Sequence, residues 1–402
     1  MKGKIEVIKN GGITSPKGFY AGAVYAGIKE KKALDLGMVY SRRVCRAAGV
    51  FTTNKIAANP VVLTRRNLRD GFAQAIVANS GCANACTGSR GLKDSKLMAG
   101  LAAQRTGSLP GHIIVASTGV IGKHLPMINI AQGMGKLSLT RSGGRDFARA
   151  IMTTDTRKKE IALRVQNGSD VYTIAGVAKG AGMIHPNMAT MFCFITTDAV
   201  IDYDYMKRSL RKAIDLTFNM ITVDGDTSPS DMVTILANGM AANKTVVEHN
   251  GKLFYKGLFN ICQYLAKSIV SDGEGATKLL QVTIESARNE NEAKMAARTI
   301  ANSALVKAAV HGNDPNWGRI IVAAGRSGAS IEEKKIDLHL NQICLMRKGT
   351  PQEYDEDELS KDMAQRKEIL IRMCLNQGKA QATGWGCDLS EEYVTINSAY
   401  TT

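Results

Sequence analysis

The most informative stretch of the sequence is Lys179-Gly180-Ala181-Gly182-Met183-Ile184-His185-Pro186-Asn187-Met188-Ala189-Thr190, followed by Met191-Phe192-Cys193-Phe194-Ile195. The second segment has no polar face, which predicts a strand buried on both sides. Gly180 and Gly182 can adopt backbone conformations that are closed to other residues, and Pro186 stiffens the approach to Thr190. Such a loop could place the Thr190 hydroxyl against the carbonyl of Ala189. Taken alone, a threonine at the start of a strand is usually only a β-branched residue that suits a strand.

Outward from this stretch, helical and extended patterns alternate along the chain. Segments 160–165 and 171–177 predict two paired strands, and segments 203–218 and 253–270 predict helices. Farther along, we expect a long helix over 291–310, a strand over 319–324, a helix over 358–375 and a closing strand over 392–397. This mixed order favours a layered α/β sandwich over a doubly wound sheet. The pattern is least continuous near residues 287–291. We therefore expect a main sandwich over residues 1–287 and a smaller α+β domain over 288–402.

Length and composition limit the class of protein. A length of 402 residues suits two or three domains. The composition, with 44% hydrophobic and 22% charged residues, is that of a globular protein and excludes a disordered or fibrous chain. No apolar run approaches the ~18 residues of a membrane span, and no apolar region follows the basic N-terminus as in a signal peptide. The eight cysteines form no CxxC pair, which fits reduced thiols. We expect a cytoplasmic protein with no membrane partner.

The net charge of +16, from 52 basic and 36 acidic residues, is unusual. Such a balance is typical of proteins with an anionic partner, nucleic acid among them. Aromatic residues are only 5% of the chain, and none alternates with the basic clusters as a base-stacking surface requires. We therefore expect a solvated basic surface and no nucleic-acid partner, with a non-enzymatic basic binding protein as one alternative. The six histidines show no ligand spacing, so we expect no metal site.

The glycine-rich stretch closely resembles the self-cleavage region of the ornithine acetyltransferase family (ArgJ, glutamate N-acetyltransferase). Other segments match motifs of that family in the same order. They lie at residues 11–19, 51–54, 79–88, 117–122, 153–156, 223–228, 271–278 and 313–319. Each motif alone is weak, but together they are specific, and the resemblance extends from residue 11 to residue 402.

The resemblance implies a self-processing fold of the N-terminal-nucleophile type. The Thr190 hydroxyl would attack the Ala189 carbonyl, and hydrolysis of the resulting ester would leave fragments 1–189 and 190–402. The freed α-amine of Thr190, with a reference pKa of roughly 7.7–8.0, could then act as the base that activates the hydroxyl. Thr190 would take the acetyl group from N2-acetyl-L-ornithine and pass it to L-glutamate in a ping-pong reaction, as a step of arginine biosynthesis.

The remaining site residues are also implied by the resemblance. Thr118 and Gly119 match the donors to the tetrahedral oxyanion. The positions that match substrate-binding residues are Thr154, Lys179, Thr190, Glu274, Asn397 and Thr402. Lys179 suits a substrate carboxylate and Glu274 suits a substrate amine, whereas the last two positions imply that the C-terminal tail is ordered and returns to the site.

Two departures from the family pattern affect loops. Cys82 stands where the family usually has asparagine, and Pro229-Ser230 stand where it usually has Thr-Asn. Neither departure touches the proposed nucleophile or the oxyanion donors, so the expected reaction type is retained. The added proline changes backbone freedom just before Asp231.

The sequence leaves several alternatives open. An amidase or aminopeptidase on the same scaffold would let water take the acyl group, and the sequence does not show whether water is excluded. No motif is specific for coenzyme A, so acetyl-CoA as a second acetyl donor stays open, and we expect no bound cofactor. The family resemblance further implies a heterotetramer with two copies of each fragment.

Overall fold

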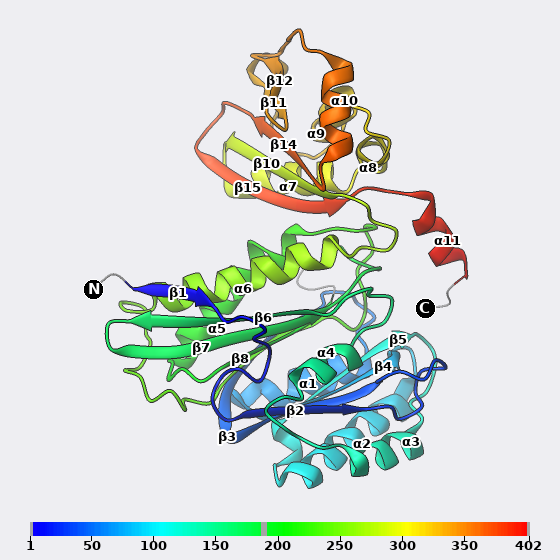
Figure 1. Ribbon diagram of the computed structural model, residues 1–402, viewed down its shortest axis with the longest axis vertical. Helices are drawn as coiled ribbons and strands as arrows, with labels where there is room; N and C mark the ends of the chain where they lie inside the picture. Colours follow the sequence, from blue (N-terminus) through cyan, green and yellow to red (C-terminus); the bar gives the residue numbers. More distant parts are fainter. Residues whose placement is uncertain (1–2, 186–190, 400–402) are drawn as a thin grey trace.

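The computed structural model describes residues 3–185 and 191–399 and contains two β-sheets with helices between and around them (Figure 1). Within these residues the first sheet has nine strands, eight of them in the order β1-β6-β7-β8-β9-β3-β4-β5, and β2 pairs with β3. Their bounds are β1 Lys4–Val7, β2 Phe19–Val24, β3 Leu36–Phe51, β4 Phe72–Cys82, β5 Ile113–Val120, β6 Lys159–Asn167, β7 Asp170–Lys179, β8 Phe192–Thr197 and β9 Met232–Ala237. The expected pairing of β6 with β7 is confirmed.

The two halves of this sheet face each other because the long strand β3 bends. Its register with β4 shifts between Tyr40 and Cys45, and a shift of this kind bends and twists a strand. Alternate residues of a strand point to opposite faces. Phe194 of β8 accordingly lies in one apolar cluster with Ile114 of β5, whereas Ile195 lies in another beneath the covering helices. The inner cluster makes this part of the chain a layered α/β sandwich, which confirms the expected fold class.

Helices cover both outer faces of the sandwich. On the β6–β9 side lie α5 Tyr203–Asp215 and α6 Lys252–Val270, and on the β4–β5 side lie α1 Asn59–Asn67, α2 Gly88–Thr106 and α3 Met127–Lys136. The short helix α4 Gly144–Ala150 packs against β2 and β3. None of the described helices is both long enough and apolar enough to cross a membrane.

The second sheet has six strands in the described residues, in the order β13-β12-β11-β14-β10-β15. Its strands and helices are β10 Leu279–Ala287, α7 Glu290–Ala301, α8 Ala304–His311, α9 Trp317–Gly325, β11 Asp337–Leu340, β12 Ile343–Arg347, β13 Thr350–Pro351, α10 Glu356–Gln365, β14 Glu368–Cys374 and β15 Ala380–Cys387. The sheet therefore begins at Leu279, before the division expected after residue 287. One apolar cluster joins α6 to β10 and α7, so this unit packs on the α6 side of the sandwich (Figure 1).

Four expected elements differ from the structure. Segment 319–324 lies in helix α9, because its buried residues Ile320, Ala323 and Ala324 have helical spacing. The closing strand over 392–397 is instead helix α11 Glu391–Ala399, which lies beside the cavity described below. The helix expected over 291–310 is interrupted at residues 302–303, between α7 and α8. The helix expected over 358–375 ends with α10, and the chain continues as β14.

Candidate active site

Several strands of the sandwich end at one edge, and residues there line a cavity. β5 ends just after Thr118 and Gly119, and β7 ends at Lys179. Because β8 runs antiparallel to β7 and parallel to β9, both β8 and β9 begin at the edge where β7 ends. The cavity has a volume of about 270 Å³. This is slightly below the ~300–1,000 Å³ usual for ligand sites, which suits a small substrate.

The cavity brings together six of the residues expected from the sequence. They are Thr118, Gly119, Thr154, Lys179, Glu274 and Asn397. Ala189, Thr190 and Thr402 lie outside the described residues. Ile184 and Met191, which stand on either side of segment 186–190, both line the cavity.

Lys179 and Thr118 contact each other in the cavity wall. The Lys179 Nζ donates a hydrogen bond to Thr118 Oγ1 at 3.3 Å. An ammonium group can only donate, so the Thr118 oxygen is the acceptor and its own hydrogen is left to donate elsewhere. Burial lowers the pKa of Lys179, while neighbouring carboxylates, Asp155 first, act to raise it. A buried cation beside a hydroxyl donor is suited to a developing oxyanion or a carboxylate.

Glu274 is held at the cavity by contacts from two directions. The Asn397 side chain on α11 donates from Nδ2 to Glu274 Oε2 at 2.8 Å. A Cβ at Gly182 would lie 2.3 Å from the same Oε2, so the carboxylate lies directly against this glycine and would have to shift to make room for a larger residue. Gly180, which was expected to adopt a backbone conformation closed to other residues, has a positive φ of +150°. Asn397 thus lies at the site, as the resemblance implied.

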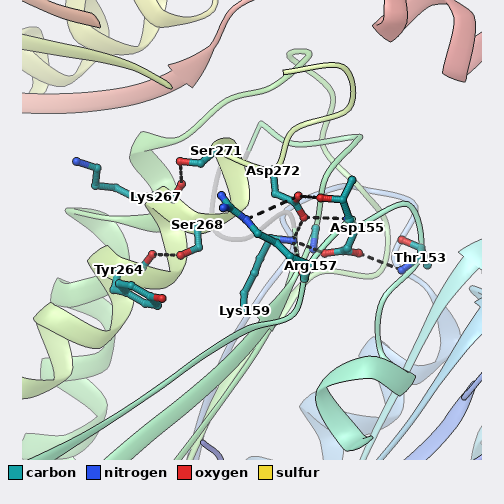
Figure 2. A network of polar contacts seen from close by, with 11 residues as sticks. Thr153, Asp155, Arg157, Lys159, Tyr264, Lys267, Ser268, Ser271 and Asp272 are labelled. Atoms are coloured by element: carbon teal, nitrogen blue, oxygen red, sulfur yellow. Dashed lines mark hydrogen bonds and ion pairs between the residues drawn. The ribbon is translucent and has the colours of Figure 1, made fainter. Parts of the chain in front are cut away.

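Figure 2 shows an ion cluster of Asp155, Lys159 and Asp272 that contacts Thr153, one of the residues that line the cavity. The Lys159 Nζ is 2.6 Å from Asp155 Oδ1 and 2.5 Å from Asp272 Oδ2, and all three side chains are at most 3% exposed. Asp155 also accepts backbone hydrogen bonds from Gly180 at 2.7 Å and from Thr153 at 3.0 Å. Burial acts to raise the pKa of Asp155, but Lys159 and Lys179 together bring it down to about 2. The cluster therefore ties the start of β6 to the cavity wall and to the loop that carries Glu274.

Two further carboxyl groups line the cavity. Asp224 accepts the backbone N–H of Met183 at 2.6 Å and that of Ile184 at 2.9 Å, and so anchors the chain just before segment 186–190. Asp231 is 2% exposed, and its Oδ2 has no hydrogen-bond partner among the residues described. Burial raises the pKa of both carboxyl groups.

The ion cluster and Asp231 are not identified by sequence reasoning. Asp155 directly follows Thr154 in the motif at 153–156, and Asp272 lies in the motif at 271–278. Their position beside expected site residues was the one feature of the sequence that could have indicated them. Asp231 follows the Pro229-Ser230 departure, which falls in the cavity wall. Cys82, the other departure from the family pattern, lies away from the cavity wall. It is buried, and its Sγ donates a hydrogen bond to the Lys123 carbonyl at 3.0 Å.

Histidine is not found among the described residues that line the cavity. His185 is held by Thr222, 3.0 Å from Nδ1, and by Arg298, 2.8 Å from Nε2. Burial and the Arg298 charge lower the pKa of His185 to about 4, so it is neutral at pH 7. Both ring nitrogens of His185 therefore have partners in the fold. In residues 3–185 and 191–399, no group of three or more His, Cys, Asp or Glu side chains could hold a metal ion.

Comparison with known proteins gives a consistent result over the full length. The ArgJ family model matches residues 20–402. The chain is 50% identical over 406 residues to the arginine biosynthesis bifunctional protein ArgJ of Dehalococcoides mccartyi, covering 100% of both chains. It is 48% identical over 398 residues to the protein of the same name from Symbiobacterium thermophilum, covering 98% of this chain and 99% of that one.

Among solved structures, two similar chains are 39% identical to this one. The arginine biosynthesis bifunctional protein ArgJ of Bacillus halodurans matches with a TM-score of 0.46, over 47% of this chain and 100% of that chain. The ornithine acetyltransferase of Mycobacterium tuberculosis, solved in complex with ornithine, matches with a TM-score of 0.44, over 46% of this chain and 100% of that chain.

Proposed function

Because this chain belongs to the ArgJ family, we propose that it is a self-cleaving acetyltransferase that moves the acetyl group of N2-acetyl-L-ornithine to L-glutamate. The observation that carries the proposal is the convergence of six residues, expected from five separate segments of the sequence, on one small cavity. The cavity is also lined by residues on either side of the segment that contains Ala189 and Thr190. The names of the full-length relatives support a role in arginine biosynthesis.

Acetyl transfer would proceed in two similar half-reactions. The Thr190 hydroxyl attacks the acetyl carbonyl of acetylornithine, and its α-amine takes the hydroxyl proton and passes it to the nitrogen of the departing ornithine. The amine of glutamate then attacks the acetyl ester. In both steps the Thr118 hydroxyl, held by Lys179, and the Gly119 N–H stabilise the oxyanion. Glu274, held by Asn397, attracts the cationic amine of ornithine, and Lys179 supplies positive charge for a substrate carboxylate.

Incubation of the purified protein with acetylornithine and isotope-labelled glutamate tests this function. We expect labelled N-acetylglutamate to form faster than free acetate. Release of acetate without labelled product would instead favour the amidase alternative. The name of the relatives, a bifunctional protein, also supports acetyl-CoA as a second donor, and acetyl-CoA as sole donor with labelled glutamate tests that activity.

We extend the proposal to the surroundings in which the enzyme works. It acts in the cytoplasm on small-molecule substrates, without a bound cofactor, nucleic acid or membrane. Two copies of fragment 1–189 and two of fragment 190–402 form a heterotetramer. Mass determination of the native assembly, followed by that of its denatured fragments, tests this composition.

Substitution of Gly119 by alanine is expected to lower kcat for acetyl transfer by roughly 100-fold, as for loss of one oxyanion donor. Gly119 has φ +124°, and a Cβ there would lie 2.4 Å from the carbonyl carbon of Gly81 on the neighbouring strand. The strand end must therefore shift and carry the Gly119 N–H with it. Gly122→Ala is the matched control, because Gly122 also has a positive φ but a Cβ there meets nothing within 4 Å. Equal losses of kcat in the two variants would contradict the oxyanion role.

A further inference from the structure

Self-cleavage makes a chemical demand that acetyl transfer does not. Before the cut, the nitrogen of Thr190 belongs to the peptide bond with Ala189, so it cannot act as a base. When that bond breaks, the same nitrogen must gain a proton. Another titratable group near the bond therefore has to move protons during cleavage.

Most titratable groups of the cavity already have a partner or are exposed. Lys179 donates to Thr118, and Glu274 accepts from Asn397. Asp224 accepts three backbone N–H groups and contacts Tyr393. Asp226 is exposed on the rim. Asp231 differs from these groups: Ser228 bonds to its carboxyl, but the buried Oδ2 has no hydrogen-bond partner among the described residues.

Asp231 lies close in the fold to Met191, the first described residue after segment 186–190. Its carbonyl accepts the Thr52 N–H at 3.0 Å, which fixes its backbone. The next residue, Met232, donates its N–H to the Met191 carbonyl at 3.0 Å, and Met191 directly follows Thr190 in the sequence. The Asp231 Oδ2 is buried and has no hydrogen-bond partner in the part of the chain that the structure describes. Burial raises its pKa well above the usual range, although Ser228 and Lys179 act against the rise.

We propose that Asp231 is the acid–base residue of self-cleavage, giving its carboxyl proton to the departing nitrogen of Thr190 and taking the hydroxyl proton of the same residue in exchange. This inference rests on the proposed cut before Thr190. A bond forms between Thr190 Oγ and the Ala189 carbonyl carbon, and the bond from that carbon to the Thr190 nitrogen breaks. One proton leaves Oγ and one reaches nitrogen, so Asp231 ends as it began, and water then hydrolyses the ester. The freed α-amine acts as the base in later turnovers.

The variant Asp231→Asn tests the role, because asparagine keeps the shape of the side chain but exchanges no proton. The full chain is synthesised in a cell-free system with a short pulse of labelled amino acid, and cleavage is followed by gel at several pH values. We expect Asp231→Asn to cleave about 100-fold more slowly than the unchanged chain. Asp226→Asn, the same change on the exposed rim of the cavity, is expected to cleave at the unchanged rate.

The pH profile separates an acid from a merely structural residue. The rate for the unchanged chain is expected to fall as pH rises through the pKa of Asp231, and Asp231→Asn is expected to lack this fall. Cleavage of Asp231→Asn at the unchanged rate would overturn the inference and leave the proposed function intact, whereas an unchanged chain that never cleaves would overturn the proposed function itself. If thermal unfolding shows that Asp231→Asn does not fold, the profile of the unchanged chain decides, and a flat or rising profile overturns the inference.

Discussion

Substitution of Thr190 by alanine is expected to leave one uncleaved chain of 402 residues and to remove acetyl transfer. Alanine lacks the hydroxyl that attacks the Ala189 carbonyl and, later, the acetyl carbonyl. Without the cut, no α-amine is released to act as a base. Removal of the nucleophile from subtilisin costs roughly 10⁶-fold in kcat, and we expect a loss of at least about 10⁴-fold here.

The intact mass of the purified protein measures this effect directly. The unchanged chain is expected to give two masses, for fragments 1–189 and 190–402, and Thr190→Ala a single mass. Thr190→Ser keeps a hydroxyl at the same position, so it is expected to cleave slowly and to keep part of the activity. Appearance of both fragments from Thr190→Ala would show that another residue makes the cut.

The expected family is confirmed by the full-length matches, and the sequence motifs alone predicted much of the cavity. Thr118, Lys179 and Glu274 stand far apart in the sequence but share one cavity. The motifs could indicate this because each contains residue types with a clear chemical use. Asp155 and Lys159 could not be predicted in this way. A carboxylate and an amine four residues apart look like solvated charges in the sequence, and only tertiary packing buries them together.

The fold was predicted best where the pattern of apolar residues is unambiguous. Both faces of β8 are apolar, and its placement between two layers follows from that pattern. The prediction was wrong at α9, where adjacent β-branched residues Ile320, Ile321 and Val322 favour a strand locally. In the structure Val322 is 66% exposed and Ala323 is buried, so packing of one helical face outweighs that local preference. Strand β14 pairs in parallel with β10, which lies about 90 residues earlier in the sequence. Local patterns do not reveal a pairing over such a distance.

Substitution of Lys159 by methionine is expected to lower the free energy of unfolding by about 3–5 kcal/mol, as for other broken buried ion pairs. The change leaves the carboxylates of Asp155 and Asp272, each at most 3% exposed, without their shared cation. Urea denaturation at pH 7 measures the effect. Lys158→Met is the matched control, because Lys158 pairs with Glu160 but its side chain is 33% exposed. This substitution is expected to lower the free energy of unfolding by less than about 1 kcal/mol. Similar costs for the two variants would contradict a special role for the buried cluster.

The same ion cluster predicts how stability changes in acid. The pKa of Asp155 is about 2 in the folded protein, against a model-compound value of 3.8. The folded state therefore binds this proton less readily than the unfolded state, so the stabilisation is fully present above pH 3.8 and is lost as pH falls towards 2. A shift of this size corresponds to roughly 2 kcal/mol. Urea denaturation across this range should show a steeper loss for the unchanged protein than for Asp155→Asn, which has no proton to gain at that position. Parallel curves would mean that the Lys159 ammonium does not stabilise the charged form of Asp155.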